Sequence, residues 1–149
     1  MIIKDADLTD IPEMESIEKS IFSEPWNKEG FESAISQPSV LCVVAKEDFS
    51  DELLGYVICY TALDEGEIVN VAVSKDHRRK GVAKSMMERV LDRAKGNGIV
   101  YFALDVRVSN EGAIRLYESF GFKTAGVRKN FYRFPTEDSF TMILELNNA

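Results

Sequence analysis

The run IVYFALDVRV at residues 99–108 is the segment that most restricts how this chain can fold. It is apolar along nearly its whole length, which is typical of a strand that is covered on both faces. A helical pattern of apolar residues precedes it, from about Gly81 to Lys95, and another follows it, from Asn110 to Ser119. We therefore predict an α/β fold in which this strand lies in the middle of a sheet with helices on both faces.

The remaining elements follow from the spacing of apolar residues and from turn signals. A first helix is predicted in DLTDIPEMESIEKSIF, with Thr9 or Asp10 as its cap and Pro12 in its first turn, and a second in EPWNKEGFESAI, capped by Asn27. Further strands are predicted at residues 2–4, 40–46, 53–63, 67–73, 122–131 and 139–146. The expected fold is a single domain over residues 1–149, with a mixed, mostly antiparallel sheet of about seven strands and about four helices.

Composition and charge exclude several classes of protein. No apolar run approaches the roughly 20 residues that cross a bilayer, and the N-terminus lacks the pattern of a signal peptide. We therefore expect a cytoplasmic protein that does not bind membranes. The formal net charge of -7 and the pI near 4.8 disfavour nonspecific binding of nucleic acid and suit a cationic partner.

The cysteine and histidine content restricts the chemistry further. Cys42 and Cys59 lie in the apolar runs VLCVVA and YVICY, without the spacing of a metal or redox motif, so we expect reduced core residues. His77 is the only histidine, which argues against a histidine-based catalytic triad and against a multi-histidine metal site. No metal is expected.

A cluster of basic residues stands where the helix after the strand at 67–73 begins. Arg78, Arg79 and Lys80 precede Gly81 and Ala83. A helix N-terminus has about four free N–H groups and a partial positive charge, so cations placed there are slightly unfavourable without a ligand. Small residues let an anion approach this backbone closely. An anion-binding site therefore explains the cluster better than a solvated surface does.

The motif is neither a P-loop nor a dinucleotide fingerprint, so ATP and NAD fit poorly. Its six residues, RRKGVA, resemble the signature Q/R-x-x-G-x-G/A of the GCN5-related N-acetyltransferase (GNAT) superfamily. DVRVSNEGAIRLYESFGFKTAGVRKNFY is similar to the RimI-type ribosomal-protein alanine N-acetyltransferases, in which VRxSNxxAxxLYxxxGF is typical. FSEPWNKEGF resembles the substrate-side segment of the same subgroup.

The resemblance implies a GNAT-like fold that uses acetyl-CoA as a cosubstrate. In that family the basic loop and the helix start hold the pyrophosphate, and the preceding strand pairs with the pantetheine arm. The cofactor-binding residues that it implies here are Val71, Ala72, Val73, Arg78, Arg79, Lys80, Gly81, Val82, Ala83, Lys84 and Asn110.

The resemblance also implies catalytic residues. Tyr117 matches the general acid that protonates the departing thiolate, although by spacing alone it could be a packing residue. Asp105 stands where RimI-like enzymes carry a glutamate base, and its carboxylate reaches about 1.5 Å less far. A purely structural role for Asp105 stays open. Glu67, on a neighbouring strand, is the candidate replacement through a water molecule, or a simple turn residue.

The expected activity is transfer of an acetyl group to a protein N-terminal α-amine, by resemblance the N-terminal alanine of a small-subunit ribosomal protein. A basic N-terminal peptide would suit the acidic surface, and Trp26, Phe131 and Tyr132 could line its groove. One alternative is acetylation of a small amine, such as a polyamine or an amino sugar. Another is a CoA-binding regulatory module without turnover, which would not need both Tyr117 and Asp105.

Overall fold

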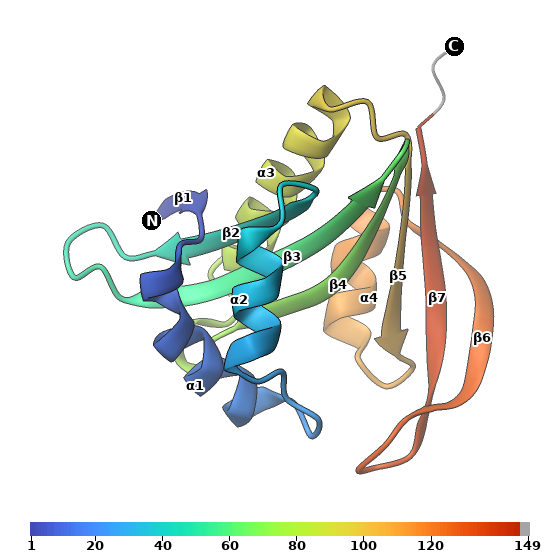
Figure 1. Cartoon of the computed structure of the whole chain (residues 1–149). Helices are drawn as coiled ribbons and strands as arrows, with labels where there is room; N and C mark the ends of the chain where they lie inside the picture. The colour runs from blue at the N-terminus through green and yellow to red at the C-terminus, as the bar shows by residue number, and fades with distance from the viewer. Residues whose placement is uncertain (147–149) are drawn as a thin grey trace.

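The computed structural model describes residues 1–146, and its seven strands form one sheet in the order β1-β2-β3-β4-β5-β7-β6 (Figure 1). The strands are β1 (Ile2–Asp5), β2 (Val40–Lys46), β3 (Leu53–Ala62), β4 (Glu65–Val73), β5 (Tyr101–Arg107), β6 (Lys123–Tyr132) and β7 (Glu137–Glu145). The α-helices are α1 (Ile11–Ile21), α2 (Lys28–Ser36), α3 (Val82–Gly96) and α4 (Glu111–Ser119). Neighbouring strands are antiparallel except β4 and β5, which confirms the predicted mixed sheet.

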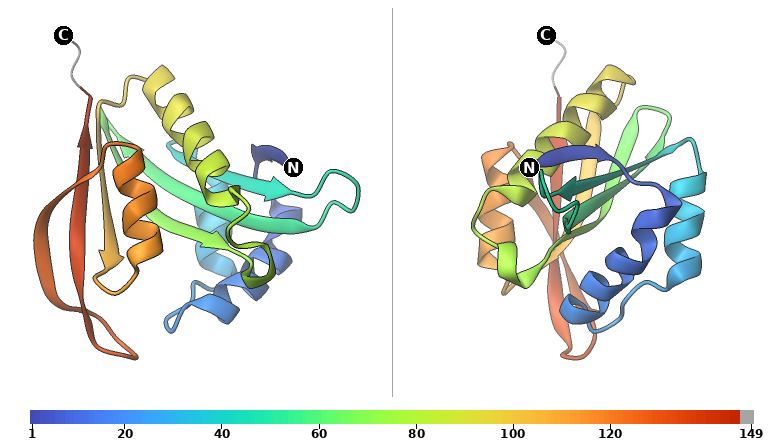
Figure 2. Two further views of the ribbon diagram at one scale, coloured as in Figure 1. Left: turned by 180° about the vertical axis from the view of Figure 1, so that it is seen from behind. Right: turned by 90° about the vertical axis from the view of Figure 1, so that its left-hand side faces the viewer.

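Two apolar layers hold the helices on the two faces of the sheet (Figure 2). The layer under α3 and α4 includes Met86, Val90 and Phe102. The layer under α1 and α2 includes Met14 and Phe31. β5 lies between β4 and β7, as its apolar sequence predicts.

Local signals placed most helix ends correctly. Asn27 and Asn110 cap α2 and α4 by accepting hydrogen bonds from the backbone N–H groups of Gly30 and Ala113. Asp10, one of the two predicted caps of the first helix, is the N-cap residue of α1, but its side chain makes no capping hydrogen bond with that helix. A 3-10 turn, Leu8–Asp10, precedes α1, and Asp7 caps that turn by accepting from Thr9 N, while Asp10 accepts from Asp7 N.

The turn between β3 and β4 also differs from its predicted position at residues 64–66. The chain reverses at Leu63 and Asp64, so β4 begins at Glu65 and the strand is two residues longer than expected. Leu63 takes a left-handed conformation with φ 57°, which the turn requires and which a leucine rarely adopts. Of the expected turn residues only Asp64 lies in the turn, because Gly66 lies within β4.

The two cysteines are buried free thiols, as predicted. Burial raises the pKa of Cys42 and of Cys59 to about 12, so both thiols stay protonated near neutral pH and are poor nucleophiles. Within residues 1–146, no helix has the length and apolarity needed to cross a membrane. No group of three or more potential ligand side chains in this part of the chain is placed to hold a metal ion.

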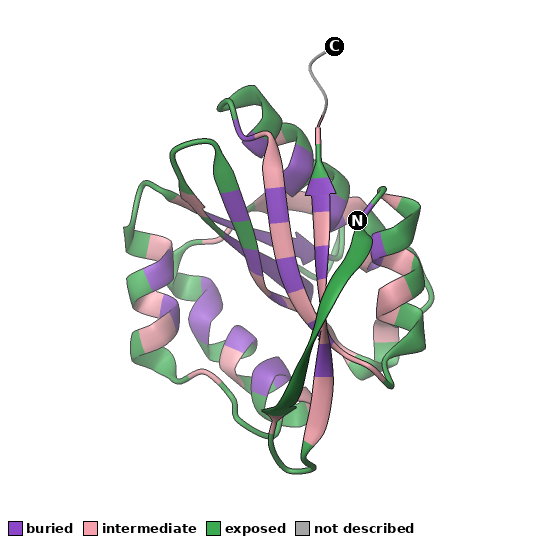
Figure 3. Cartoon of the chain, turned by 90° about the vertical axis from the view of Figure 1, so that its right-hand side faces the viewer, coloured by how far each residue is buried: buried purple, intermediate pink, exposed green. Residues whose placement is uncertain are grey.

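The outer strand β6 is exposed along nearly its whole length (Figure 3). Its pairing with β7 is interrupted near the far end, where Arg128 faces Ser139 but Tyr132 faces Glu137. Residues 129–131 therefore face only Asp138, and this bulge bends the end of β6. The backbone N–H of Asn130 donates to Asp138 Oδ1 at 2.9 Å.

Candidate active site

The site begins where the parallel strands β4 and β5 separate. Their pairing covers only four residues on each strand, from Glu65 opposite Tyr101 to Ile68 opposite Leu104. β3 shows why the strands separate: Ile58 faces Asn70 and Cys59 faces Ile68, so Val69 is an extra residue in β4. Such a bulge bends a strand and increases its twist.

The bulge also changes which residues face which helices. Before the bulge, Ile68 packs in the layer under α3. After it, the odd-numbered residues Val71 and Val73 contact this layer, and Ala72 lies in the layer under α1 and α2. A cavity of about 660 Å³ opens between the separating strands. Its walls come from α1, the connection from α1 to α2, β4, β5, α4 and the turn between β6 and β7.

The strand residues predicted to meet a pantetheine arm are placed unequally. Val71 lines the cavity, together with Val69 and Asn70. Ala72 and Val73, one and two residues further on, pair with β3 and are not part of the described cavity wall. The predicted residues therefore overlap the cavity wall only at Val71, and the part of β4 that lines the cavity runs from Ile68 to Val71.

The basic residues precede α3 as an exposed loop. Arg78, Arg79, Lys80 and Lys84 are exposed and form no ion pair with any residue in 1–146. The first intrahelical hydrogen bond of α3 runs from Ser85 N to the carbonyl of the N-cap residue. The N–H groups before Ser85 are therefore free of helical partners, and no acidic residue lies in this first turn.

Gly81 is the N-cap residue of α3, and its φ of 78° is left-handed. A Cβ atom added there would meet nothing within 4 Å, so only the backbone conformation requires glycine in the protein itself. Val82, the first residue of α3, is buried in the core, and Ala83 is partly exposed. The turn therefore combines free N–H groups, exposed cations and room for a ligand.

Tyr117 on α4 and Asn110, the N-cap residue of this helix, line the cavity. The side chain of Tyr117 is 7% exposed and packs edge-on against Phe122, with ring centroids 6.1 Å apart. Within residues 1–146 the Tyr117 hydroxyl makes no hydrogen bond and borders the cavity. Burial, with a smaller contribution from Tyr132, raises the pKa of Tyr117 above its usual value near 10, so the phenol stays protonated.

Asp105 lies on β5, and one of its two carboxylate oxygens is hydrogen-bonded to residues of β7. Oδ1 accepts hydrogen bonds from Thr141 Oγ1 at 2.7 Å and from Ser139 Oγ at 3.3 Å. Arg128 Nε lies 3.3 Å from the same oxygen. Oδ2 makes no hydrogen bond or ion pair with the described residues, so Asp105 has one oxygen fixed to β6 and β7 and one available to a ligand or water.

Glu67 does not line the main cavity. It lies in a second cavity of about 300 Å³, which it shares with Asp105 and Thr141. Asp105 and its neighbour Leu104 are common to both cavities. The structure thus places Asp105 between the main cavity, which contains Tyr117, and a separate opening that contains Glu67.

All three aromatic residues predicted at the acceptor side line the main cavity. Trp26 packs on Phe31, with ring centroids 5.4 Å apart, and its backbone N–H donates to Glu18 Oε2 at 3.0 Å. Phe131 and Tyr132 reach the cavity from β6, with their rings 5.1 Å apart and nearly perpendicular.

Sequence reasoning missed several charged residues in the cavity wall, and two of them are central to its hydrogen bonding. Glu18 is only 2% exposed and accepts hydrogen bonds from Tyr56, Asn70 and the Trp26 backbone. Its position three residues before Ile21 and four after Met14 puts it on the apolar stripe of α1, which is a signal that could have identified it. The second is Arg107, a charged residue that ends an apolar strand.

Comparison with known proteins identifies the family of this chain. The family model described as the Acetyltransferase (GNAT) family matches residues 11–122. Proteins named ribosomal protein bS18-alanine N-acetyltransferase are 33% identical in Salmonella typhimurium, over 93% of both chains, and 31% identical in Escherichia coli, over 97% of both. The crystal structure of the ribosomal-protein-S18-alanine N-acetyltransferase from Escherichia coli matches with a TM-score of 0.90 at 31% identity, covering 99% of this chain and 95% of that one. The chain belongs to the acetyltransferase (GNAT) family.

Proposed function

We propose that this protein transfers the acetyl group of acetyl-CoA to a protein N-terminal α-amine, and that its acceptor is the N-terminal alanine of ribosomal protein bS18. The observation that carries the proposal is the separation of β4 and β5, which opens one cavity bordered by both Tyr117 and Asp105. Likeness to the bS18-alanine N-acetyltransferases over nearly the whole chain supports the acceptor.

The proposed cofactor site lies at the start of α3. The free N–H groups after Gly81 and the exposed cations suit a pyrophosphate, and the open space at Gly81 gives it room. The pantetheine arm would pair with the edge of β4 that faces β5, which pairs with no strand of residues 1–146 beyond Ile68, at Val71 and, further on, at Ala72 and Val73. Asn110, at the start of α4, would contact the cofactor. Acetyl-CoA supplies the electrophilic acetyl group when it is bound.

Tyr117 would act as the general acid. Its raised pKa keeps the phenol protonated across the pH range in which an α-amine loses its proton. Its hydroxyl borders the cavity and is not occupied by another residue of the described chain. A proton donor needs both properties.

Asp105 would accept the amine's proton, directly or through water, at its free oxygen Oδ2. Because Asp105 also borders the second cavity, a proton could pass from it toward Glu67 and the solvent. Glu67 is thus in a position to support Asp105 through water and is less suited to contacting the amine itself.

The acceptor would enter between Trp26 and the aromatic pair Phe131 and Tyr132. The net charge of -7, in a chain whose basic loop serves the cofactor, favours a cationic peptide. The choice of an α-amine follows from acidity. With a pKa near 8 for the α-amine and near 10.4 for lysine, the neutral fraction at about pH 7.5 differs by about 200-fold.

Asp105 provides a test of the proposed base. We expect Asp105→Ala to lower kcat about 10- to 100-fold, less than the full effect of a general base, because part of the α-amine is already neutral. Asp105→Glu should keep or raise activity, and Glu67→Gln should lower it less than Asp105→Ala does. Steady-state rates with a free α-amine peptide measure all three, and a fully active Asp105→Ala would remove Asp105 from the mechanism.

The acceptor is tested with two peptides of equal charge. One has a free N-terminal alanine followed by basic residues, and the other is N-terminally blocked and contains lysines. With acetyl-CoA, mass spectrometry should show faster acetylation of the first, at a rate that rises between pH 7 and pH 8 as more of the α-amine becomes neutral. Faster modification of the blocked peptide would contradict the α-amine, and acetylation of small amines alone would favour the small-amine alternative.

A further inference from the structure

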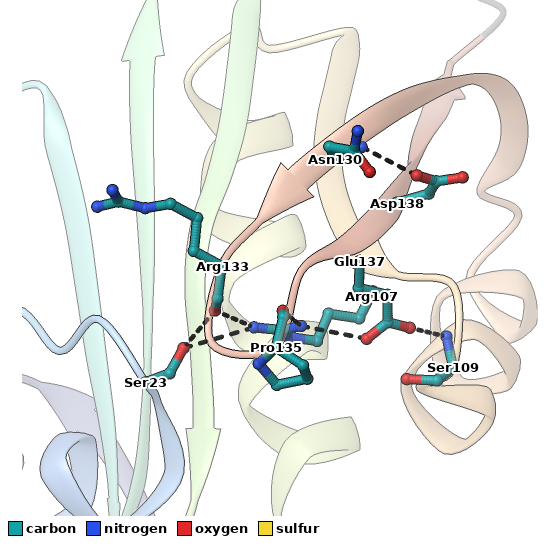
Figure 4. Close-up of polar contacts among 8 residues, drawn as sticks. All are labelled: Ser23, Arg107, Ser109, Asn130, Arg133, Pro135, Glu137 and Asp138. Carbon is teal, nitrogen blue, oxygen red and sulfur yellow. Dashed lines mark hydrogen bonds and ion pairs between the residues drawn. The ribbon is translucent and has the colours of Figure 1, made fainter.

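The side chain of Arg107, at the end of β5, joins segments that border the mouth of the cavity (Figure 4). Nη1 donates to the carbonyl oxygen of Pro135 at 2.9 Å and to Glu137 Oε1 at 3.1 Å. Nη2 donates to the carbonyl oxygen of Arg133 at 3.0 Å and lies 3.5 Å from Ser23 Oγ. We call Arg107 and these four oxygen partners the Arg107 latch.

The latch extends to the helix that carries Tyr117. The second carboxylate oxygen of Glu137 accepts a hydrogen bond from Ser109 N at 2.7 Å, directly before the cap of α4 (Figure 4). The hydrogen bond from Ser109 and the charge of Arg107 lower the pKa of Glu137, so the carboxylate stays ionised. The ion pair between Arg107 and Glu137 joins the end of β5 to the start of β7. The other hydrogen bonds of these two side chains reach the turn between β6 and β7 and the residue before the cap of α4.

The same turn is joined to the connection between α1 and α2. Ser23 Oγ donates to the carbonyl oxygen of Arg133 at 2.9 Å, and the Arg133 side chain pairs with Glu24 at 2.5 Å. The Arg107 guanidinium lies over the ring of Tyr132, 4.6 Å from its centroid. Both walls of the mouth, residues 22–26 and 131–135, therefore meet around Arg107.

We propose that Arg107 is a positioning residue that holds the turn between β6 and β7 against the connection between α1 and α2, and so shapes the acceptor entrance. This rests on the proposed function and deepens it. Two of the four partners are backbone carbonyls, which every residue type provides, so the latch depends on Arg107 more than on the residues of the turn. The two Nη atoms of a guanidinium can donate to these separated acceptors at the same time. The donors of a lysine ammonium all lie on one nitrogen atom, so a lysine cannot reproduce this arrangement.

The kinetic test is Arg107→Lys, which keeps the charge and loses the planar fork. We expect KM for the free N-terminal alanine peptide to rise about 10- to 30-fold, because the turn spends less time in the conformation that binds the acceptor. The Kd of CoA, measured by calorimetry, and kcat should change by less than about threefold. The matched control is Arg93→Lys, since Arg93 pairs with Asp5 between α3 and β1, outside the cavity wall.

A second measurement needs no acceptor. Trypsin cleavage after Arg133 requires the turn to open, and its rate should rise about tenfold in Arg107→Lys relative to cleavage in the exposed loop at Arg79. Glu137→Gln, which weakens the same latch without touching β5, should change the cleavage in the same direction. If Arg107→Lys does not fold, the acceptor KM and the rate of cleavage after Arg133 are both measured with Glu137→Gln.

The outcomes separate the two proposals. An unchanged acceptor KM in a folded latch variant, or a rise equal to that in Arg93→Lys, would overturn the positioning role. A parallel loss of CoA affinity would do the same, because it would mean a general structural effect. Wild-type protein that acetylates no α-amine peptide would instead overturn the proposed function, and unchanged cleavage after Arg133 would independently overturn the latch.

Discussion

The Tyr117→Phe variant is expected to turn over about 100 to 1,000 times more slowly than the wild-type protein. The substitution removes the hydroxyl that we propose protonates the departing thiolate, and it keeps the ring that packs on Phe122. Because this hydroxyl bonds to no residue in the described chain, its loss should change the free energy of unfolding by less than about 1 kcal/mol. The KM for acetyl-CoA should change little.

Rapid-mixing and steady-state rates, measured beside thermal unfolding, check this prediction. A chemical step as slow as the steady-state rate would place the loss in acetyl transfer. A kcat near the wild-type value would assign Tyr117 to packing alone, the interpretation that its apolar surroundings permit. A large loss of stability would mean that the hydroxyl has a partner in solution.

Gly81→Glu should weaken CoA binding about 100-fold or more, which corresponds to about 2.7 kcal/mol. The new carboxylate would occupy the open space beside the first turn of α3 and would repel a pyrophosphate there. In the protein alone it meets no atom within 4 Å, so the cost to folding is limited to the left-handed backbone, about 1–2 kcal/mol.

Gly98→Glu is the matched control. Gly98 also has a left-handed φ, 87°, and a Cβ atom there would also meet nothing within 4 Å, but it follows the opposite end of α3. Both variants therefore carry the same backbone strain and the same added charge. Calorimetry with CoA should find near wild-type affinity for Gly98→Glu. Equal affinity of the two variants would mean that the basic loop is a solvated surface and does not bind the cofactor.

Features set by neighbouring residues were predictable from the sequence. The helix starts at Asn27 and Asn110 depend on local hydrogen bonds between the side chain of each residue and the backbone of the first turn. The turn at Leu63 was not predictable, because tertiary structure there imposes a conformation that leucine disfavours alone.

The candidate site divides in the same way. The positions of Tyr117 and Asp105 follow from motifs, and both residues line the cavity, whereas the basic loop, which was also found from a motif, does not line it. The hydrogen bond from Thr141 to Asp105 Oδ1 joins residues that are 36 positions apart in the sequence. In the Arg107 latch, Arg107 contacts Ser23, which is 84 positions away. No local pattern records such contacts, which appear only once the sheet order is known.

The bulge at Val69 has a consequence for where such a site can exist. Neighbouring parallel strands gain backbone hydrogen bonds by continuing to pair, so β4 and β5 would close the cavity if their registers stayed compatible. One extra residue stops this pairing after Ile68. Larger or smaller side chains around the opening leave that mismatch in place, whereas deletion of a single residue between Ile68 and Asn70 would remove it. The location of the proposed reactive centre is therefore fixed by a count of residues along β4 more than by their identities.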